Sequence, residues 1–362
     1  MEENKILAEL KAKLTGSAED DNKFLRAEAE RFAAEKNLEG VDAATQLLIE
    51  LMPEGQRAEI DRLIHIDGMR LDEMHDKIMA LIKEKNMTEA KSFAERLYKK
   101  ITVDYKEDDK AKFVSLRNTF EDNLYQLRYK PEKVLNRTPF DFATFITTYG
   151  YLLVETGSPL DAIPVLEKAM EYNPLDCGPK FELAEVYKLL KNKRMTLEVS
   201  RDALKSASSP VAIARCYANA GYALTEMGEY DDAFVFLSAS VFFAPHPAIP
   251  FEMRDLVARK GKPIKEPSRE DMIEVLKKYD FGFGADQDVI SVAAQLSAHY
   301  LMEEDIPNAL KALKMTYNLT RDEQVKEIIM RYEPDAPMVA PIHENVGDEP
   351  QITQTVNDSP EN

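Results

Sequence analysis

The chain has 362 residues, of which 44% are hydrophobic, and its formal net charge is −18 at pH 7. This acidic balance argues against nucleic-acid binding, which needs a basic surface. No run of about 18 apolar residues occurs, so we expect no membrane span. The charged N-terminus lacks the apolar segment of a secretory signal, and Cys177 and Cys216 are not spaced as metal ligands. We therefore expect a reduced, cytoplasmic protein.

Apolar residues recur at helical spacing along most of the chain, and strand patterns are scarce. Residues 1–135 are predicted to form irregular helical hairpins. The predicted helices there are 5–15, 20–36, 41–51, 56–66, 70–85, 88–101 and 108–127. Pro53 and Gly55 break this series, and the proline-containing segment 128–139 is predicted to be a connector.

From residue 140 the predicted helices pair regularly. Three hairpins are expected within 140–245, with helices at 140–155 and 159–172, 177–190 and 193–206, and 211–227 and 230–243. An insertion at 246–285 follows, with short helices at 251–260 and 268–279. A fourth hairpin and a capping helix are expected within 286–332, with helices at 286–303, 306–318 and 321–331. Residues 333–362 hold seven acids and no Lys or Arg, so we predict a disordered acidic tail.

Nine identical residues recur at an offset of 71 in the middle of the chain. About one or two matches are expected by chance at ordinary residue frequencies. The pairs are Gly150/Gly221, Tyr151/Tyr222, Leu153/Leu224, Glu155/Glu226, Gly157/Gly228, Asp161/Asp232, Ala162/Ala233, Leu166/Leu237 and Pro174/Pro245. Such self-similarity is typical of a repeat architecture.

The glycines and prolines of this repeat have clear structural uses. Gly150 and Gly221 fall where two helices cross, where only small residues permit close approach. Gly157 and Gly228 suit the turn between the helices of a hairpin, where a positive φ is expected. Pro174 and Pro245 end the second helix. The hairpins are therefore predicted to pack through equivalent contacts.

The hairpin unit resembles the tetratricopeptide repeat, in which about 34 residues form two antiparallel helices. Units begin at Ala143, Cys177, Ala214 and Ile290, and the second departs from the family pattern at Thr196 and Ser200. The resemblance implies an all-α, helical-hairpin solenoid with a right-handed superhelical curve and a protein or peptide as partner.

In this family the first helix of each unit lines a concave groove that binds partners. Carried over to this chain, the resemblance implies a groove that includes Thr147, Tyr151, Glu155, Phe181, Glu185, Lys188, Arg215, Asn219, Tyr222 and Glu226. An alternative for Tyr151 and Tyr222 is that they only pack on the next unit. Some family members bind chaperone C-termini through a clamp of Lys, Asn and Arg. Only Arg215 fits that clamp, so this role is not expected.

No motif for catalysis is evident. The glycines of Phe281-Gly-Phe-Gly-Ala follow a helix rather than a strand and are interpreted as a hinge or turn. His65 and His75 lie among acidic residues in what we interpret as a solvated corner. We predict no catalytic, cofactor-binding or metal-binding residues, and no enzymatic activity.

The function that the sequence favours is a non-catalytic interaction module or scaffold that binds a peptide or partner helix in the groove. The alternative is a peptide-responsive signalling regulator in which the N-terminal helices act as effector. An enzyme-associated subunit is the third hypothesis.

Overall fold

The computed structural model describes residues 5–35 and 37–335, and within them it has 18 helices and four short strands. The predicted all-α hairpin architecture is confirmed. The predicted disordered tail lies outside the described residues from residue 336 onward. Contacts divide the chain into two compact units, Met1–Lys77 and Ile78–Asn362, and each unit has a core of its own.

The first unit is a small helical cluster. It contains α1 (Lys5–Lys11), α2 (Ala18–Ala34), α3 (Leu38–Glu50) and α4 (Glu54–Ile64), followed by the antiparallel pair of β1 (His65–Ile66) and β2 (Met69–Arg70). Leu25 and Leu47 are buried between α2 and α3, which packs these helices against each other. Ser17 and Asn37 accept backbone N–H groups at the starts of these helices. Helix α5 (Leu71–Lys83) contains the division between the units.

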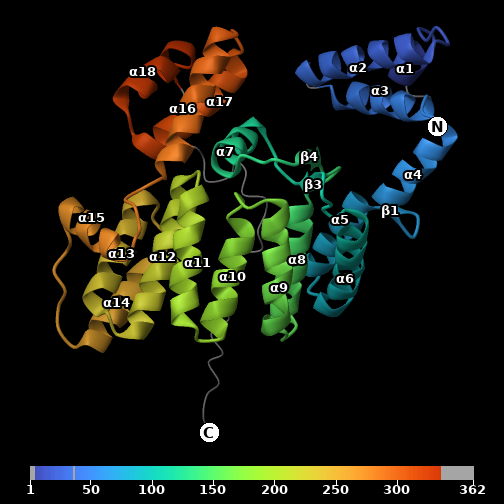
Figure 1. Ribbon diagram of the computed structural model, residues 1–362. Coiled ribbons are helices and arrows are strands. Elements are labelled where there is room, and N and C mark those ends of the chain that lie inside the picture. The colour runs from blue at the N-terminus through green and yellow to red at the C-terminus, as the bar shows by residue number, and fades with distance from the viewer. Residues whose placement is uncertain (1–4, 36, 336–362) are drawn as a thin grey trace. The chain divides into compact units, whose positions relative to one another are not determined.

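The second unit is dominated by helices that stand beside one another, coloured teal to yellow in Figure 1. They are α6 (Met87–Asp104), α8 (Phe142–Glu155), α9 (Pro159–Tyr172), α10 (Gly178–Leu189), α11 (Lys193–Ser206), α12 (Pro210–Met227) and α13 (Tyr230–Phe243). Helices α8–α9, α10–α11 and α12–α13 are the three predicted hairpins. Helix α6 packs on α8, and α10 packs on both hairpins beside it.

The 71-residue repeat is realised as equivalent contacts in the first and third hairpins. A Cβ atom on Gly150 would lie 2.5 Å from Leu166 Cδ2, and one on Gly221 would lie 2.9 Å from Leu237 Cδ2. Both leucines are buried. Gly157 and Gly228 have φ of 81° and 88°, as the turn requires. The predicted roles of these four glycines are therefore confirmed.

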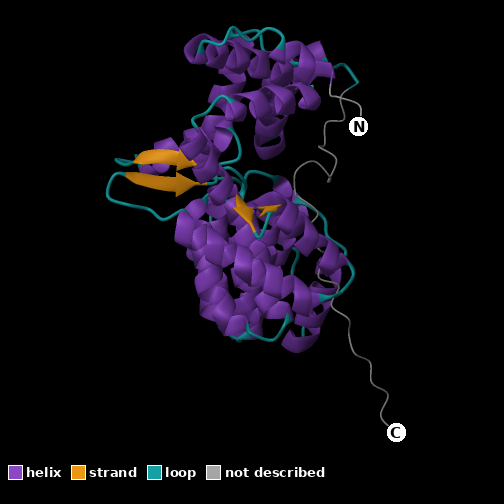
Figure 2. Ribbon diagram, turned by 90° about the vertical axis from the view of Figure 1, so that its right-hand side faces the viewer, coloured by secondary structure: helices purple, strands orange, loops and turns teal. Residues whose placement is uncertain are grey.

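The prediction of one helix over 108–127 is wrong. The segment instead forms β3 (Ala111–Val114) and α7 (Thr119–Tyr129), and β4 (Val134–Arg137) pairs in parallel with β3, with Ala111 opposite Val134. Figure 2 shows this strand pair among the helices. The side chain of Asn118 accepts the N–H of Glu121 and so fixes the start of α7 beyond the strand. The partner strand lies over 20 residues away, which local periodicity does not show.

The remaining helices are α14 (Ile249–Lys260), α15 (Arg269–Lys278), α16 (Gln287–Met302), α17 (Ile306–Thr320) and α18 (Glu323–Tyr332). Helices α14 and α15 of the insertion pack on α13. The predicted fourth hairpin, α16–α17, exists, but α16 packs chiefly on α7 rather than on the third hairpin. Val289, Val292 and Leu296 of α16 join the same core as Leu124 and Tyr125 of α7. This core contact places α16 to α18 next to α7 (Figure 1).

The loop at 281–285, interpreted from the sequence as a hinge or turn, is fixed against α12. The hydroxyl of Tyr217 donates to Gly282 O and accepts from Gly284 N, both at 2.7 Å. Phe281 and Phe236 pack edge to face, with ring centroids 5.0 Å apart. These two hydrogen bonds to the buried Tyr217 and the packing of Phe281 hold the segment between α15 and α16 against α12.

Candidate functional site

The three first helices α8, α10 and α12 present one face, which we call the first-helix face. Its position follows from local sequence. Asp141 and Ser209 accept backbone N–H groups at the starts of α8 and α12. Helix α10 packs on both α8 and α12, so the three first helices follow one another side by side. All ten residues predicted for the groove lie on these helices.

A cluster of polar side chains lies at the centre of this face. The Lys188 ammonium donates to Glu185 Oε1 at 2.8 Å and to Asn219 Oδ1 at 2.7 Å. The same ammonium lies 5.2 Å from the ring centroid of Tyr222, a cation–π distance. Asn219 is only 4% exposed, and its Nδ2 group has no hydrogen-bond partner among the described residues. Four of the predicted residues thus meet at one point.

Phe181 and Arg215 form a second contact between α10 and α12. The guanidinium of Arg215 lies 4.4 Å from the ring centroid of Phe181, and its Nη2 atom lies 3.9 Å from Glu182 Oε1. Phe181 is 6% exposed and belongs to the core. The Phe181 ring therefore packs against the guanidinium of Arg215 and contributes little exposed area to the first-helix face.

The α8 part of the face is less polar. The hydroxyl of Thr147 donates to Ala143 O within the helix at 2.7 Å. Burial raises the pKa of Tyr151 to about 12, and the nearby carboxylates of Glu155 and Glu182 add to this rise. Tyr151 therefore keeps its proton at neutral pH and remains a hydrogen-bond donor. Glu155 is exposed beside it.

Helix α14 adds residues that the sequence did not point to. Arg259 pairs with Glu226 of α12 at 2.6 Å and with Asp255 at 2.7 Å. Protein atoms around the Glu252 carboxylate exclude water and so raise its pKa. The positive charge of Lys188 opposes this rise, and the negative charge of Glu185 adds to it. The insertion helix thus lies along the end of the face near Tyr222 and Glu185. In the sequence, Glu252, Asp255 and Arg259 are spaced to lie on one side of a helix, and this pattern could have indicated a charged face on α14.

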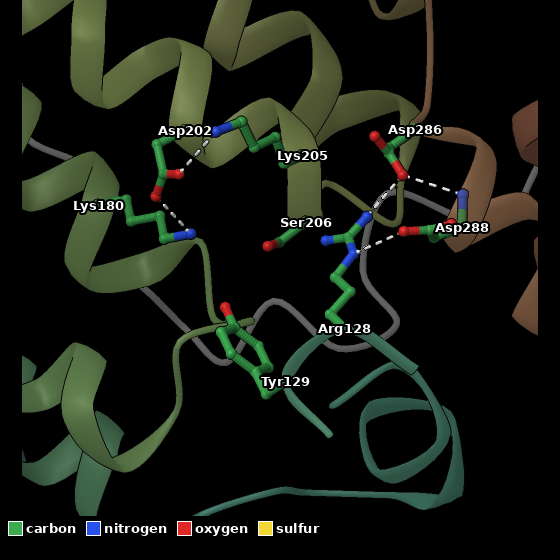
Figure 3. Close-up of a pocket in the computed structure, with 8 residues that line it drawn as sticks. All are labelled: Arg128, Tyr129, Lys180, Asp202, Lys205, Ser206, Asp286 and Asp288. Carbon is green, nitrogen blue, oxygen red and sulfur yellow. Dashed lines mark hydrogen bonds and ion pairs between the residues drawn. The ribbon is translucent and has the colours of Figure 1, made fainter. Parts of the chain in front are cut away.

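A separate polar pocket of about 360 Å³ lies between α7, the ends of α10 and α11, and the start of α16 (Figure 3). Asp202 pairs with Lys180 at 2.9 Å and with Lys205 at 3.5 Å. Arg128 pairs with Asp286 at 2.6 Å and with Asp288 at 3.2 Å. The sequence alone does not indicate this pocket, because α7 and α16 lie far apart in the chain.

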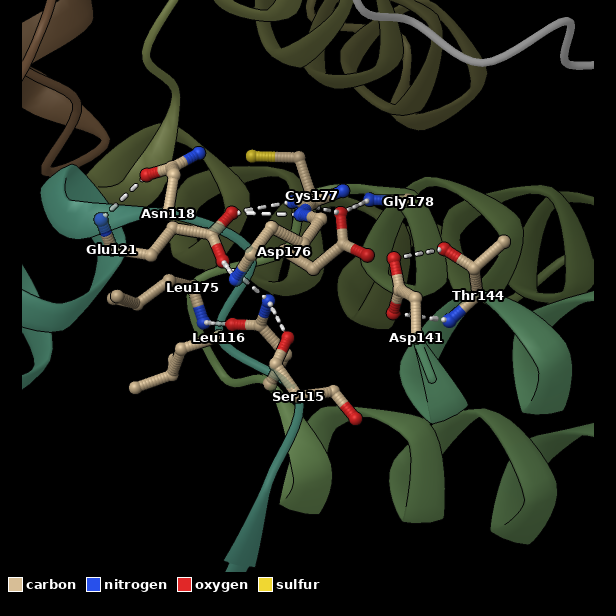
Figure 4. A network of polar contacts seen from close by, with 12 residues as sticks. Ser115, Leu116, Asn118, Glu121, Asp141, Thr144, Leu175, Asp176, Cys177 and Gly178 are labelled. Carbon is tan, nitrogen blue, oxygen red and sulfur yellow. Dashed lines mark hydrogen bonds and ion pairs between the residues drawn. The ribbon is translucent and has the colours of Figure 1, made fainter. Parts of the chain in front are cut away.

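A buried polar network holds the segment after β3 on the junction of α9 and α10 (Figure 4). The side chain of Asn173 donates to Ser115 O at 3.1 Å and to Glu121 Oε2 at 2.9 Å, and accepts from Leu175 N at 3.1 Å. Arg117 bonds Glu121 at 2.7 Å and Asp176 at 3.2 Å. Burial by itself would lower the pKa of Arg117. The carboxylates of Asp176 and Glu121 outweigh this effect and hold the pKa above its usual value. The network is structural and positions α7 beside the pocket.

The thiols of Cys177 and Cys216 are free. Burial raises the pKa of Cys177 to about 12 and that of Cys216 well above its usual value. Both are therefore protonated and unreactive at neutral pH. Within residues 5–35 and 37–335 no group of three His, Cys, Asp or Glu could hold a metal ion. No helix in the same ranges is long and apolar enough to cross a membrane.

His75 of the predicted solvated corner is half-buried rather than solvated. Burial lowers its pKa to about 4, against a weaker opposite effect of Asp76. Between pH 6.5, the pKa of His75 in the unfolded chain, and pH 4, the unfolded chain binds more protons at His75 than the folded chain does. The free energy of unfolding therefore falls as the pH drops from about 6.5 to 4. We expect a loss on the order of 2–3 kcal/mol from this group. An NMR titration of the full chain should give His75 a midpoint near 4; a midpoint near 6.5 would contradict this.

No family model and no curated protein matches the chain. Among solved structures, one described as a functional characterization of pilF from Pseudomonas aeruginosa is 12% identical. It covers 73% of this chain and 99% of that one, with a TM-score of 0.37. A tetratricopeptide repeat protein from Parabacteroides merdae is also 12% identical. It covers 85% of this chain and 97% of that one, with a TM-score of 0.38.

The six helices of 142–243 form the three hairpins on which the family resemblance was based, with bounds within two residues of those predicted. Equivalent glycines occupy the crossings and the turns of the first and third hairpins. Residues 142–243 therefore fold as three consecutive helical hairpins, the arrangement that the resemblance to the tetratricopeptide repeat predicts.

Proposed function

We propose that the chain is a non-catalytic protein-interaction module whose first-helix face binds an extended peptide segment of a partner. The observation that carries this proposal is Asn219. Its Nδ2 group is buried on that face and has no acceptor among the described residues. A buried donor left unpaired costs about 1–3 kcal/mol. A peptide carbonyl oxygen would supply the missing acceptor once the neighbouring side chains that cover this group move aside.

Lys188 fixes which way the Asn219 amide points. An ammonium group only donates, so the atom that faces Lys188 at 2.7 Å is the carboxamide oxygen. The Nδ2 group must then point away from Lys188. Tyr222 beside it adds a ring against which a peptide can pack. Together these side chains would contact the backbone of an extended segment, which is the same for every sequence.

The charges nearby favour a basic side chain in the partner. Lys188 is already bonded to Glu185 and Asn219, and Arg259 is already paired with Glu226 and Asp255. The carboxylate of Glu252 has no hydrogen bond or ion pair in the part of the chain that the structure describes, although its backbone N–H donates to Ala248 O. A Lys or Arg of the partner that reached Glu252 would form an ion pair with it. This pair would stabilise the carboxylate, whose charge is disfavoured by loss of water.

A peptide-display selection on the full chain tests the proposal. A random library is selected on the wild type, and recovered peptides are then measured against Asn219→Ala and against Asn318→Ala as control. Asn318 lies on α17, away from the face. We expect peptides to bind Asn219→Ala about tenfold more weakly, because loss of one buried hydrogen bond changes affinity by about this factor. Binding to the control should be unchanged. Equal binding to both variants would contradict the proposal.

The same selection tests the charge preference separately. Recovered peptides should be rich in Lys and Arg, and selection on Glu252→Lys should remove this enrichment. Peptides that depend on Asn219 but show no basic enrichment would disprove the preference and leave the binding face intact. A peptide that changes amide exchange in residues 5–70 as well would favour the signalling alternative over a simple scaffold.

A further inference from the structure

We propose that the polar pocket between α7, α10–α11 and α16 binds the phosphate group of a small phosphomonoester. The pocket is separate from the first-helix face and independent of its proposed function. Its floor is made by Lys180, which is 4% exposed, and Ser206, which is 6% exposed. A buried ammonium and a buried hydroxyl that line one polar cavity form a site built into the fold.

Hydrogen-bond donors converge on the pocket. Figure 3 shows the Lys180 ammonium, the hydroxyls of Tyr129 and Ser206 and the guanidinium of Arg128 facing one common space. The hydroxyls of Tyr129 and Ser206 have no hydrogen bond within the described residues. The Arg128 guanidinium uses Nε and Nη2 for Asp288 and Asp286, which leaves Nη1 uncommitted. Burial raises the pKa of Tyr129, so its hydroxyl keeps its proton and remains a donor.

The carboxylates around the pocket are already engaged. Asp202 holds Lys180 and Lys205, and Asp286 accepts both Arg128 and the N–H of Asp288. These pairs hold Lys180 and Arg128 in place, and the Lys180 ammonium and Arg128 Nη1 keep N–H groups available to the pocket. Four or more donors from several directions suit a tetrahedral oxyanion better than a planar carboxylate. A volume of about 360 Å³ exceeds what a single phosphate ion fills and suits a small organic phosphate.

Calorimetric titration of the full chain tests this assignment, with inorganic phosphate, glycerol 3-phosphate, acetate and glycerol as probes at constant ionic strength. We expect saturable binding of glycerol 3-phosphate with a Kd of about 1 mM or tighter, weaker binding of phosphate, and none of glycerol. Preferred binding of acetate would show that the site takes a carboxylate and would overturn the proposal.

Variants locate the binding. Ser206→Ala and Lys205→Gln should each weaken glycerol 3-phosphate binding about five- to tenfold. Lys326→Gln is the matched control, because Lys326 forms an i,i+3 pair with Glu323 as Lys205 does with Asp202. Arg128→Gln should abolish binding, and its melting curve shows whether it folds. No saturable binding to the wild type, or equal binding to all variants, would overturn the proposal.

Discussion

Replacing Gly150 by Leu is expected to destabilise the second unit by about 3 kcal/mol or more. Even a single Cβ atom at this position would lie 2.5 Å from Cδ2 and 2.7 Å from Cγ of Leu166. Leu166 is fully buried and has no free space to move into. The longer side chain must therefore push α8 and α9 apart. Thermal unfolding followed by circular dichroism should show the second unit melting about 5–10 °C lower.

The control is the same substitution at Gly55. This glycine lies near the start of α4, where an added Cβ meets nothing within 4 Å. Leu is a better helix former than Gly, so Gly55→Leu should be neutral or slightly stabilising. If the two variants melt alike, the close crossing of α8 and α9 does not hold this hairpin together.

Loss of the Asn173 side chain is expected to cost about 4 kcal/mol, since Asn173→Ala removes three hydrogen bonds at once. The residue is 0% exposed, so water cannot replace them. The Leu175 N–H and the Ser115 carbonyl oxygen would be left buried and unpaired. Urea unfolding of the full chain, read as the free energy of unfolding of the second unit, measures the effect.

Asn192→Ala serves as the matched control for this variant. Asn192 is exposed and caps α11 through one hydrogen bond, from the N–H of Met195 at 3.2 Å. Its loss should cost about 1 kcal/mol. Equal losses in the two variants would mean that the network in Figure 4 adds little to the docking of α7.

The hairpins could be predicted because their determinants are local. The predicted bounds of 159–172, 193–206 and 230–243 match α9, α11 and α13 to the residue. Glycine at the crossings and turns, and proline after the second helix, are readable without knowledge of the fold. The family resemblance implied that Glu185, Lys188, Asn219 and Tyr222 lie in one groove, and in the structure these four side chains lie close together.

The parts that were missed depend on contacts between distant segments. Strand β3 forms because β4 is available to pair with it, and residues 108–118 alone do not show this. The packing of α16 on α7 likewise depends on a core that includes both helices. Glu252 and Arg259 reach the first-helix face only because α14 packs on α13. The polar pocket likewise needs α7, α10, α11 and α16 to come together from distant parts of the chain.

Amide hydrogen exchange of the full chain, with and without a peptide recovered by selection, tests the central claim most directly. The bound peptide should slow exchange in α10 and α12, at 178–189 and 210–227, because it covers the face around Asn219 and Tyr222. At a peptide concentration near the wild-type Kd, protection of these segments should be several times smaller in Asn219→Ala. Protection confined to other helices, with α10 and α12 unaffected in the wild type, would contradict the assignment of the first-helix face as the binding site.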